Sequence, residues 1–141
     1  MISSIVSRGS AVLLAGVGFV LLFAPDLLLP RLVPGYPPGG LWLGQVLGAA
    51  AGGLAALNWL SRSLLLGGIY GRSVVMPNAT CFFIAALVLL RAASRAGSDA
   101  AMLWVLGLVV AVPALVYGWL LFRGPFERDL EAQRAGQGRD A

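Results

Sequence analysis

The chain has 141 residues, of which 59% are hydrophobic and only 11% are charged, and its formal net charge is +4. A soluble domain carries about 25% charged residues, so this composition excludes a globular surface that faces water. The ten basic residues are all arginines and lie at the ends of apolar runs and in loops. No basic stripe with interleaved aromatic residues is present, which argues against binding to nucleic acid.

The first apolar run extends over about residues 10–29 and is interrupted at Pro25. A cleaved signal peptide is the competing interpretation of such a run. The apolar character resumes at Leu27, however, and Leu22 spoils a small-x-small cleavage site before Ala24. We therefore expect the run to be retained as a membrane-spanning helix.

Three further apolar runs are long enough to cross the hydrocarbon core of a bilayer, at about residues 40–60, 74–91 and 101–122. The pattern predicts an all-α fold, an integral membrane four-helix transmembrane bundle over residues 1–123. A polar cytoplasmic tail over residues 124–141 follows it.

Four tryptophans bracket two of these runs, Trp42 with Trp59 and Trp104 with Trp119. At a helical rise of about 1.5 Å per residue, the members of each pair lie roughly 22–26 Å apart. Indole rings prefer the two headgroup boundaries of a bilayer, and these boundaries have about this separation. The two halves of the chain also share a layout of tryptophan, apolar span, tryptophan, leucines and arginine, which suggests two similar hairpins.

The arginines favour one orientation in the membrane. Four spans place both termini on the same side, and the arginines on that side outnumber those on the other. The first group is Arg8, Arg62, Arg72, Arg123, Arg128, Arg134 and Arg139, and the second is Arg31, Arg91 and Arg95. By the positive-inside rule, both termini are expected in the cytoplasm.

Small residues recur at every fourth position of the second span, and we expect them to form a helix-packing face. They are Gly40, Gly44, Gly48, Gly52 and Ala56. Small residues let two helix backbones approach closely, where dispersion and weak Cα–H contacts favour association. The face can serve packing inside the bundle or self-association between copies, and the sequence leaves both open.

Polar residues gather near the cytoplasmic boundary and form the candidate binding site of the chain. They include Asn58, Arg62, Tyr70, Arg72 and Asn78. Two arginines beside two amides can hold an anionic lipid headgroup or a small anionic ligand. The alternative is ordinary membrane anchoring, in which the arginines follow the positive-inside rule and Tyr70 belongs to the aromatic belt.

The residue types needed for catalysis are largely missing. There is no histidine, the single cysteine is Cys81, and no acidic residue lies inside a span. Proton pathways in membranes usually carry such acidic residues, and a serine or cysteine nucleophile needs a base beside it. We therefore expect no enzymatic activity, no catalytic residue, no bound metal and no cofactor.

The segment from Asn58 to Arg62, the segment from Gly67 to Arg72 and Asn78 together resemble small bacterial four-helix membrane proteins, DoxX-like in layout. This resemblance implies four spans in the bacterial cytoplasmic (inner) membrane with both termini inside, and it implies no particular activity.

Two functions follow as hypotheses. The leading one is a non-enzymatic accessory or scaffold subunit that packs in a larger membrane complex, with the lipid bilayer and a membrane protein, or a second copy, as partners. The alternative is a lipid- or small-molecule-binding bundle of the transport type that uses the region of Arg62, Arg72 and Asn78.

Overall fold

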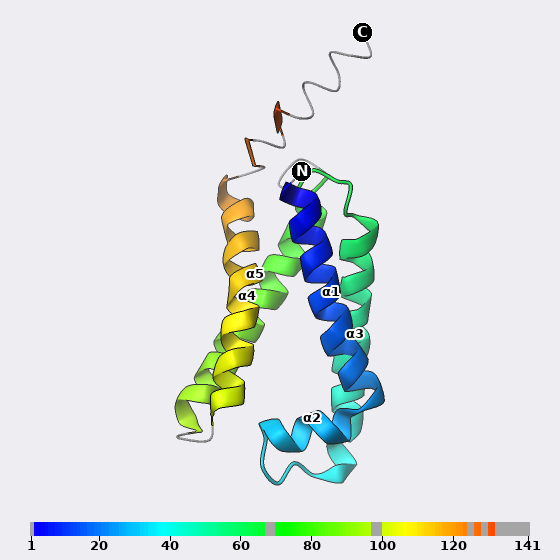
Figure 1. Ribbon diagram of the computed structural model, residues 1–141, viewed down its shortest axis with the longest axis vertical. Helices are drawn as coiled ribbons and strands as arrows, with labels where there is room; N and C mark the ends of the chain where they lie inside the picture. The colour runs from blue at the N-terminus through cyan, green and yellow to red at the C-terminus, as the bar shows by residue number, and fades with distance from the viewer. Residues whose placement is uncertain (1, 67–69, 97–99, 124–125, 128–129, 132–141) are drawn as a thin grey trace. The chain divides into compact units, whose positions relative to one another are not determined.

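A computed structural model describes residues 2–66, 70–96, 100–123, 126–127 and 130–131. Within these ranges the chain is helical and contains no strand, which confirms the all-α fold class (Figure 1). The long helices are α1 (Ile2–Phe23), α3 (Leu41–Leu60), α4 (Arg72–Arg95) and α5 (Ala101–Arg123). A short helix α2 (Pro25–Leu32) and the 3-10 turn η1 (Pro38–Gly40) lie between α1 and α3.

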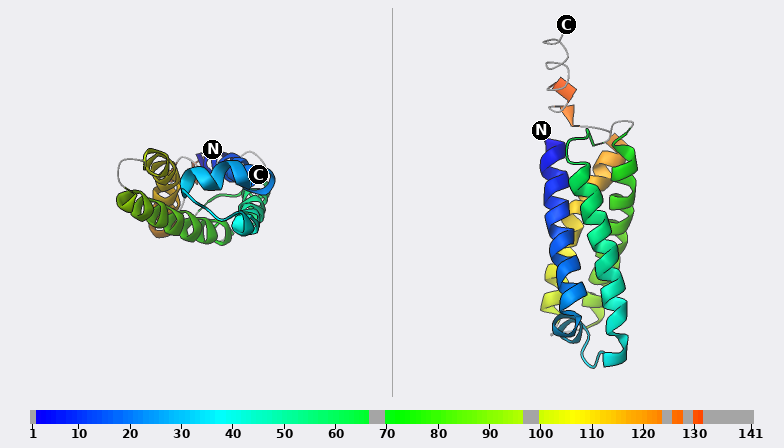
Figure 2. Two further views of the ribbon diagram at one scale, coloured as in Figure 1. Left: turned by 90° about the horizontal axis from the view of Figure 1, so that it is seen from below. Right: turned by 90° about the vertical axis from the view of Figure 1, so that its right-hand side faces the viewer.

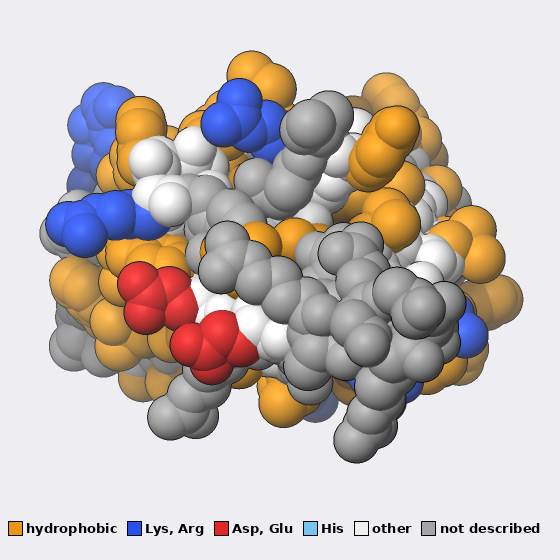
Figure 3. Space-filling view, turned by 90° about the horizontal axis from the view of Figure 1, so that it is seen from above, with side chains coloured by type: hydrophobic (Ala, Val, Ile, Leu, Met, Phe, Trp, Pro, Cys, Tyr) orange, Lys and Arg blue, Asp and Glu red, His pale blue; other side chains and the backbone are white. Residues whose placement is uncertain are grey.

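Four segments are long and apolar enough to cross a membrane: α1, Pro38–Leu60, α4 and α5. Their number agrees with the four predicted spans, and the chain is a multi-pass membrane protein. Hydrophobic side chains make up much of the surface visible in Figure 3, and large apolar residues such as Phe122 are 88% exposed. Exposed apolar side chains in such number are suited to lipid rather than water. Most of the predicted tail, residues 124–141, lies outside the described residues.

The first span differs from its prediction at both ends. Helix α1 begins at Ile2 rather than near residue 10, and it ends at Phe23 rather than near residue 29. Proline has no backbone N–H and disfavours the helical conformation in the residue before it. Ala24, which precedes Pro25, accordingly has φ −140° and ψ 49°. The chain becomes helical again at Pro25 and forms the separate helix α2.

The chain divides into two compact units. The first, residues 8–60, contains most of α1 together with α2 and α3. In this unit α1 and α3 run side by side, and α2 lies across the end where the chain passes from one to the other (Figures 1 and 2). The second unit joins residues 1–7 to the chain from Ser61 onward, and it contains the antiparallel hairpin of α4 and α5.

The hairpin of the second unit packs through one face of each helix. On α4 the buried residues follow steps of three and four, and they include Val75, Ala79, Phe82, Ala86 and Ala93. This is the seven-residue spacing that keeps one face of a helix against its neighbour. The ring of Phe82 stacks on that of Tyr117 of α5 at a centroid distance of 5.9 Å. Both rings are almost fully buried, so this pair forms the centre of the α4–α5 contact.

Candidate functional site

The predicted helix-packing face of α3 is divided between different neighbours. A Cβ atom at Gly48 would lie 2.9 Å from the carbonyl oxygen of Gly18 and 3.0 Å from the backbone N of Leu22, both on α1. A Cβ atom at Gly44 would lie 2.8 Å from Cδ1 of Leu29 on α2. Glycine at these two positions therefore allows α1 and α2 to pack closely on α3 within the first unit.

The other members of the row have different surroundings. Gly40 meets the ring of Tyr36, whose hydroxyl donates a 2.9 Å hydrogen bond to the carbonyl of Gly40. A Cβ atom at Gly52 would have no neighbour within 4 Å, and Ala56 is exposed. The row is thus an internal packing surface at Gly44 and Gly48 and an open surface further along the helix.

The geometry of an α-helix explains this division. Residues four apart are separated by about 400° of rotation, so each step turns the row by about 40° around the helix axis. From Gly44 to Ala56 the row therefore turns by roughly 120°. It passes from the buried side of α3 to the margin of the α1 contact. A row that keeps one face would alternate steps of three and four.

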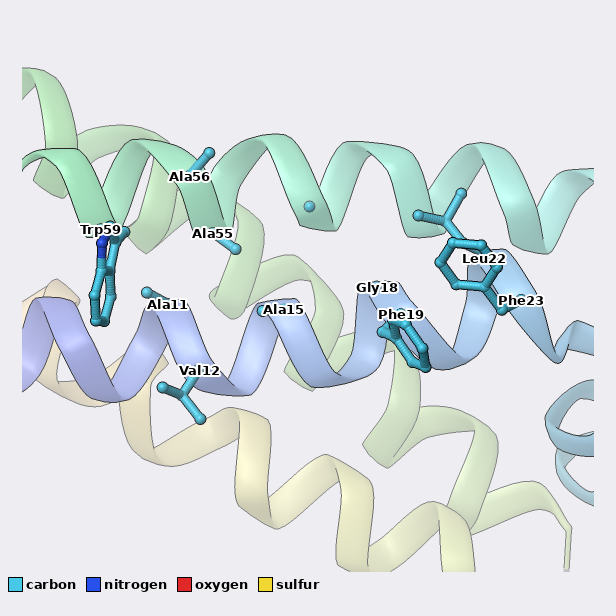
Figure 4. A pocket seen from close by; sticks show the side chains of 11 residues that line it. Ala11, Val12, Ala15, Gly18, Phe19, Leu22, Phe23, Ala55, Ala56 and Trp59 are labelled. Atoms are coloured by element: carbon cyan, nitrogen blue, oxygen red, sulfur yellow. The ribbon is translucent and has the colours of Figure 1, made fainter.

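A groove of about 500 Å³ runs between α1 and α3 in the first unit (Figure 4). Small residues form its inner surface, including Gly18 and Ala15 on α1 and Ala55 on α3, and larger apolar side chains form its edges. The edge residues are Val12, Phe19, Leu22, Phe23 and Trp59. Trp59 lies opposite the Ala11 end of the groove, and Phe19 and Phe23 lie toward the other end (Figure 4). The groove is almost entirely apolar.

A second groove, of about 530 Å³, lies between α4 and α5 in the second unit. Its lining is also apolar apart from Thr80, and it includes Phe83, Gly118 and Trp119. Trp119 stacks on Phe126 at a centroid distance of 5.0 Å, so the ring of Phe126 packs on the C-terminal part of α5. Both units therefore present open, apolar grooves rather than a polar cavity.

The polar residues of the predicted binding site lie in several environments. Asn58 is buried on α3 in the first unit, and the other four belong to the second unit. Arg62 is half-buried, whereas Tyr70 and Arg72 are exposed at the start of α4. Asn78 is buried, and its side-chain amide donates a 2.8 Å hydrogen bond to the carbonyl of Val74, one turn earlier in the same helix.

Arg72 and Asn78 lie on different faces of α4. They are six residues apart on α4, which separates them by about 120° around the axis and about 9 Å along it. Arg72 is exposed and Asn78 is buried, as this rotation requires. The exposed pair Tyr70 and Arg72 fits membrane anchoring, and the structure does not join it to Asn78 as one polar site.

Sequence reasoning missed a row of buried serines on α1, formed by Ser3, Ser7 and Ser10. The Ser3 hydroxyl accepts a hydrogen bond of 3.3 Å from the backbone N–H of Leu66, which lies in the same unit. Ser7 Oγ is buried and has no hydrogen-bond partner among the described residues. The spacing of four and then three residues was the available signal, because it places all three serines on one face of a helix.

The described residues contain no group of three or more His, Cys, Asp or Glu side chains that could hold a metal ion. Their grooves are apolar, and most of their charged side chains are exposed. No protein-family model, no curated protein and no solved structure matches the chain. The DoxX-like resemblance therefore stays a prediction.

Proposed function

We propose that this protein is a non-enzymatic accessory or scaffold subunit of a larger membrane complex, and that it binds its partner through the outward face of α3. This face consists of the small residues Ala49 and Gly53 between the larger apolar residues Val46, Leu57 and Leu60. The proposal also follows from the sequence, because the chain has no histidine and none of its four long helices contains an acidic residue.

The observation that carries the proposal is the open space at Gly53. Ala49 and Gly53 are both exposed, and a Cβ atom at Gly53 would have no atom within 4 Å. Gly44 and Gly48, by contrast, are already occupied by contacts within the unit. A second helix can therefore approach closely at Gly53, and no neighbour among the described residues occupies this position.

Small residues on an exposed transmembrane face favour protein over lipid as the neighbour. Apolar side chains gain little from helix association alone, because lipid tails are as apolar as leucine. Where Ala and Gly lie four residues apart, however, a second helix can bring its backbone close and gain dispersion contacts along both helices. Val46 at 61% exposure and Leu60 at 76% exposure extend this contact surface in both directions along α3.

We further propose that the complex lies in the bacterial cytoplasmic membrane with both termini in the cytoplasm. The excess of arginine beside the ends of α3, α4 and α5 on that side supports this orientation. A cysteine introduced at Ser63, in a Cys81→Ser background, is then labelled from the cytoplasmic side only. Labelling from the outer side would contradict the orientation.

The test of the proposal compares three variants by native mass spectrometry of the protein released gently from its own membrane. Gly53→Leu fills the outward face and is expected to abolish a partner that the wild type holds at fixed stoichiometry. Gly16→Leu is the matched control, because Gly16 is also exposed in a helix with open space around it, and it is expected to retain the partner. Arg72→Ala is likewise expected to retain it. Release of the wild type alone, or equal assembly by Gly53→Leu, would contradict the proposal.

A further inference from the structure

The groove between α1 and α3 has dimensions that suit a single hydrocarbon chain. On α1 it extends from Ala11 to Phe23, which is about 18 Å at a rise of 1.5 Å per residue. Its far end lies near the opposite membrane boundary, because the side-chain amide of Gln45, three residues from Trp42, donates a hydrogen bond to the carbonyl of Leu22. The groove therefore runs along most of the apolar length of α1, a path that one extended acyl chain can follow.

The lining of the groove suits the same occupant. Gly18 on α1 and Ala55 on α3 are small, so they leave an apolar channel between the two helices. Carbon atoms pack at about 3.5–4.0 Å, so a chain of methylene groups that lies in this channel contacts both helices.

A positive charge stands at one end of the groove. Arg8 is exposed and belongs to the same unit as the groove. It precedes Val12, Ala15, Phe19 and Leu22 on α1 by steps of four, three, four and three residues, so all five lie on one face of the helix. This is the face that lines the groove. Arg8 thus continues the groove by one turn beyond its Ala11 end.

Trp59 identifies that end as the boundary between hydrocarbon and headgroups. It lines the groove opposite Ala11 and is about half exposed (Figure 4). Indole rings prefer this depth, and an arginine beside it extends its guanidinium toward the headgroups. The groove therefore starts at the interface with a cation and an indole, and it continues toward Phe19 and Phe23 in the hydrocarbon.

We propose that this groove binds one acyl chain of an anionic phospholipid, whose headgroup phosphate pairs with Arg8. The small residues of the inner surface let the chain approach both helix backbones, and the aromatic edges enclose it. This site differs from the outward face of α3, because Ala49 and Gly53 do not line the groove. The inference is independent of the proposed partner subunit, and it gives lipid binding a location away from Arg72 and Asn78.

The test uses Trp59 as a reporter inside the site. A variant with Trp42→Phe, Trp104→Phe and Trp119→Phe is reconstituted in phosphatidylcholine vesicles that contain a minor fraction of lipid with brominated acyl chains. The brominated lipid is either phosphatidylglycerol or phosphatidylcholine at the same mole fraction, and its contact quenches Trp59 fluorescence. We expect an apparent preference of about five-fold for phosphatidylglycerol, which is about 1 kcal/mol at 1.4 kcal/mol per tenfold.

Two pairs of variants separate the headgroup contact from the acyl chain contact. Arg8→Gln is expected to remove the preference, whereas Arg31→Gln, at another exposed arginine of the same unit, is expected to keep it. Ala56→Leu partly fills the groove and is expected to lower quenching by both lipids. Ala50→Leu replaces an exposed alanine of α3 outside the groove and is expected to leave quenching unchanged.

Three results would overturn the inference. Equal quenching by the two lipids in the parent variant would mean that only the general lipid environment touches Trp59. An equal effect of Arg8→Gln and Arg31→Gln would remove Arg8 from the site. Shielding of Trp59 from both lipids would mean that a protein surface covers the groove. If the triple tryptophan variant does not fold, native mass spectrometry of the wild type and Arg8→Gln decides instead, through loss of retained phosphatidylglycerol.

Discussion

The contact between Gly18 of α1 and Gly48 of α3 predicts that alanine has opposite effects on stability at Gly48 and at Gly53, two glycines of the same helix. Gly48→Ala places a Cβ atom 2.9 Å from the carbonyl oxygen of Gly18 and 2.9 Å from Cβ of Leu21. Gly53→Ala places its Cβ atom in open space. Both substitutions lie in the interior of α3 and gain the same helix propensity, so their difference isolates the packing contact.

The magnitude follows from two opposing effects. Replacing glycine by alanine in a helix interior stabilises the helix by about 1 kcal/mol. Overpacking a well-packed contact costs about 1–3 kcal/mol, and at Gly48 the nearest atoms include backbone, which cannot rotate away. Gly53→Ala is therefore expected to stabilise the fold by about 1 kcal/mol, and Gly48→Ala to destabilise it by about 0–2 kcal/mol.

The assay is reversible unfolding in mixed micelles with increasing denaturing detergent, followed by helical circular dichroism. Gly48→Ala is expected to be less stable than Gly53→Ala by about 1–3 kcal/mol, which is about 5-fold to 140-fold in the unfolding equilibrium. Gly18→Ala addresses the same contact from α1 and should resemble Gly48→Ala. Equal stability of the Gly48→Ala and Gly53→Ala proteins would refute the close approach of the two helices.

Three further predictions concern the second unit and use the same unfolding assay. Phe82 is 2% exposed and Phe83 is 58% exposed, so Phe82→Ala should cost about 3–5 kcal/mol and Phe83→Ala much less; equal losses would contradict the stacked α4–α5 centre. Ser3→Ala removes the acceptor of the Leu66 N–H and should cost about 1–3 kcal/mol, and no loss would mean that water replaces it. Gly107→Ala meets Cδ2 and Cγ of Leu90 at 2.8 and 3.1 Å but no backbone atom closer than 3.5 Å, so it should cost less than Gly48→Ala, and an equal cost would mean that the leucine side chain cannot move.

The span pattern was predictable from the sequence because it depends on composition over long windows. The tryptophans near the ends of α3 and α5 indicated the interfaces, and all four are partly exposed in the structure. The start of α1 was not predictable in this way, because Ser3, Ser7 and Arg8 lower the local apolar character. The three serines lie on one buried face, so the helix extends through a segment that a hydropathy window rejects.

The neighbour that each glycine of α3 meets depends on its direction around the helix axis, and a regular four-residue spacing in the sequence conceals how this direction changes. Gly44, Gly48 and Gly52 look equivalent in the sequence, but successive members turn by about 40° and meet different neighbours. The groove was not predictable either, since it requires the α1 and α3 faces to be placed against each other. Its local signal in the sequence was the spacing of three and four residues from Arg8 through Val12 to Leu22. Apolar residues at such spacing are ordinary in a membrane-spanning helix, so they did not indicate a groove.

The measurement that tests the accessory role most directly is photocrosslinking in the native membrane. A benzophenone amino acid is placed at Val46 or Leu57 on the outward face of α3, and in a control at Val12 on the edge of the α1–α3 groove. The proposed role predicts crosslinks from Val46 and Leu57 to one other polypeptide, and lipid adducts from Val12. Lipid adducts from all three positions, or a product with twice the 14.7 kDa mass of the chain, would contradict a partner subunit at this face.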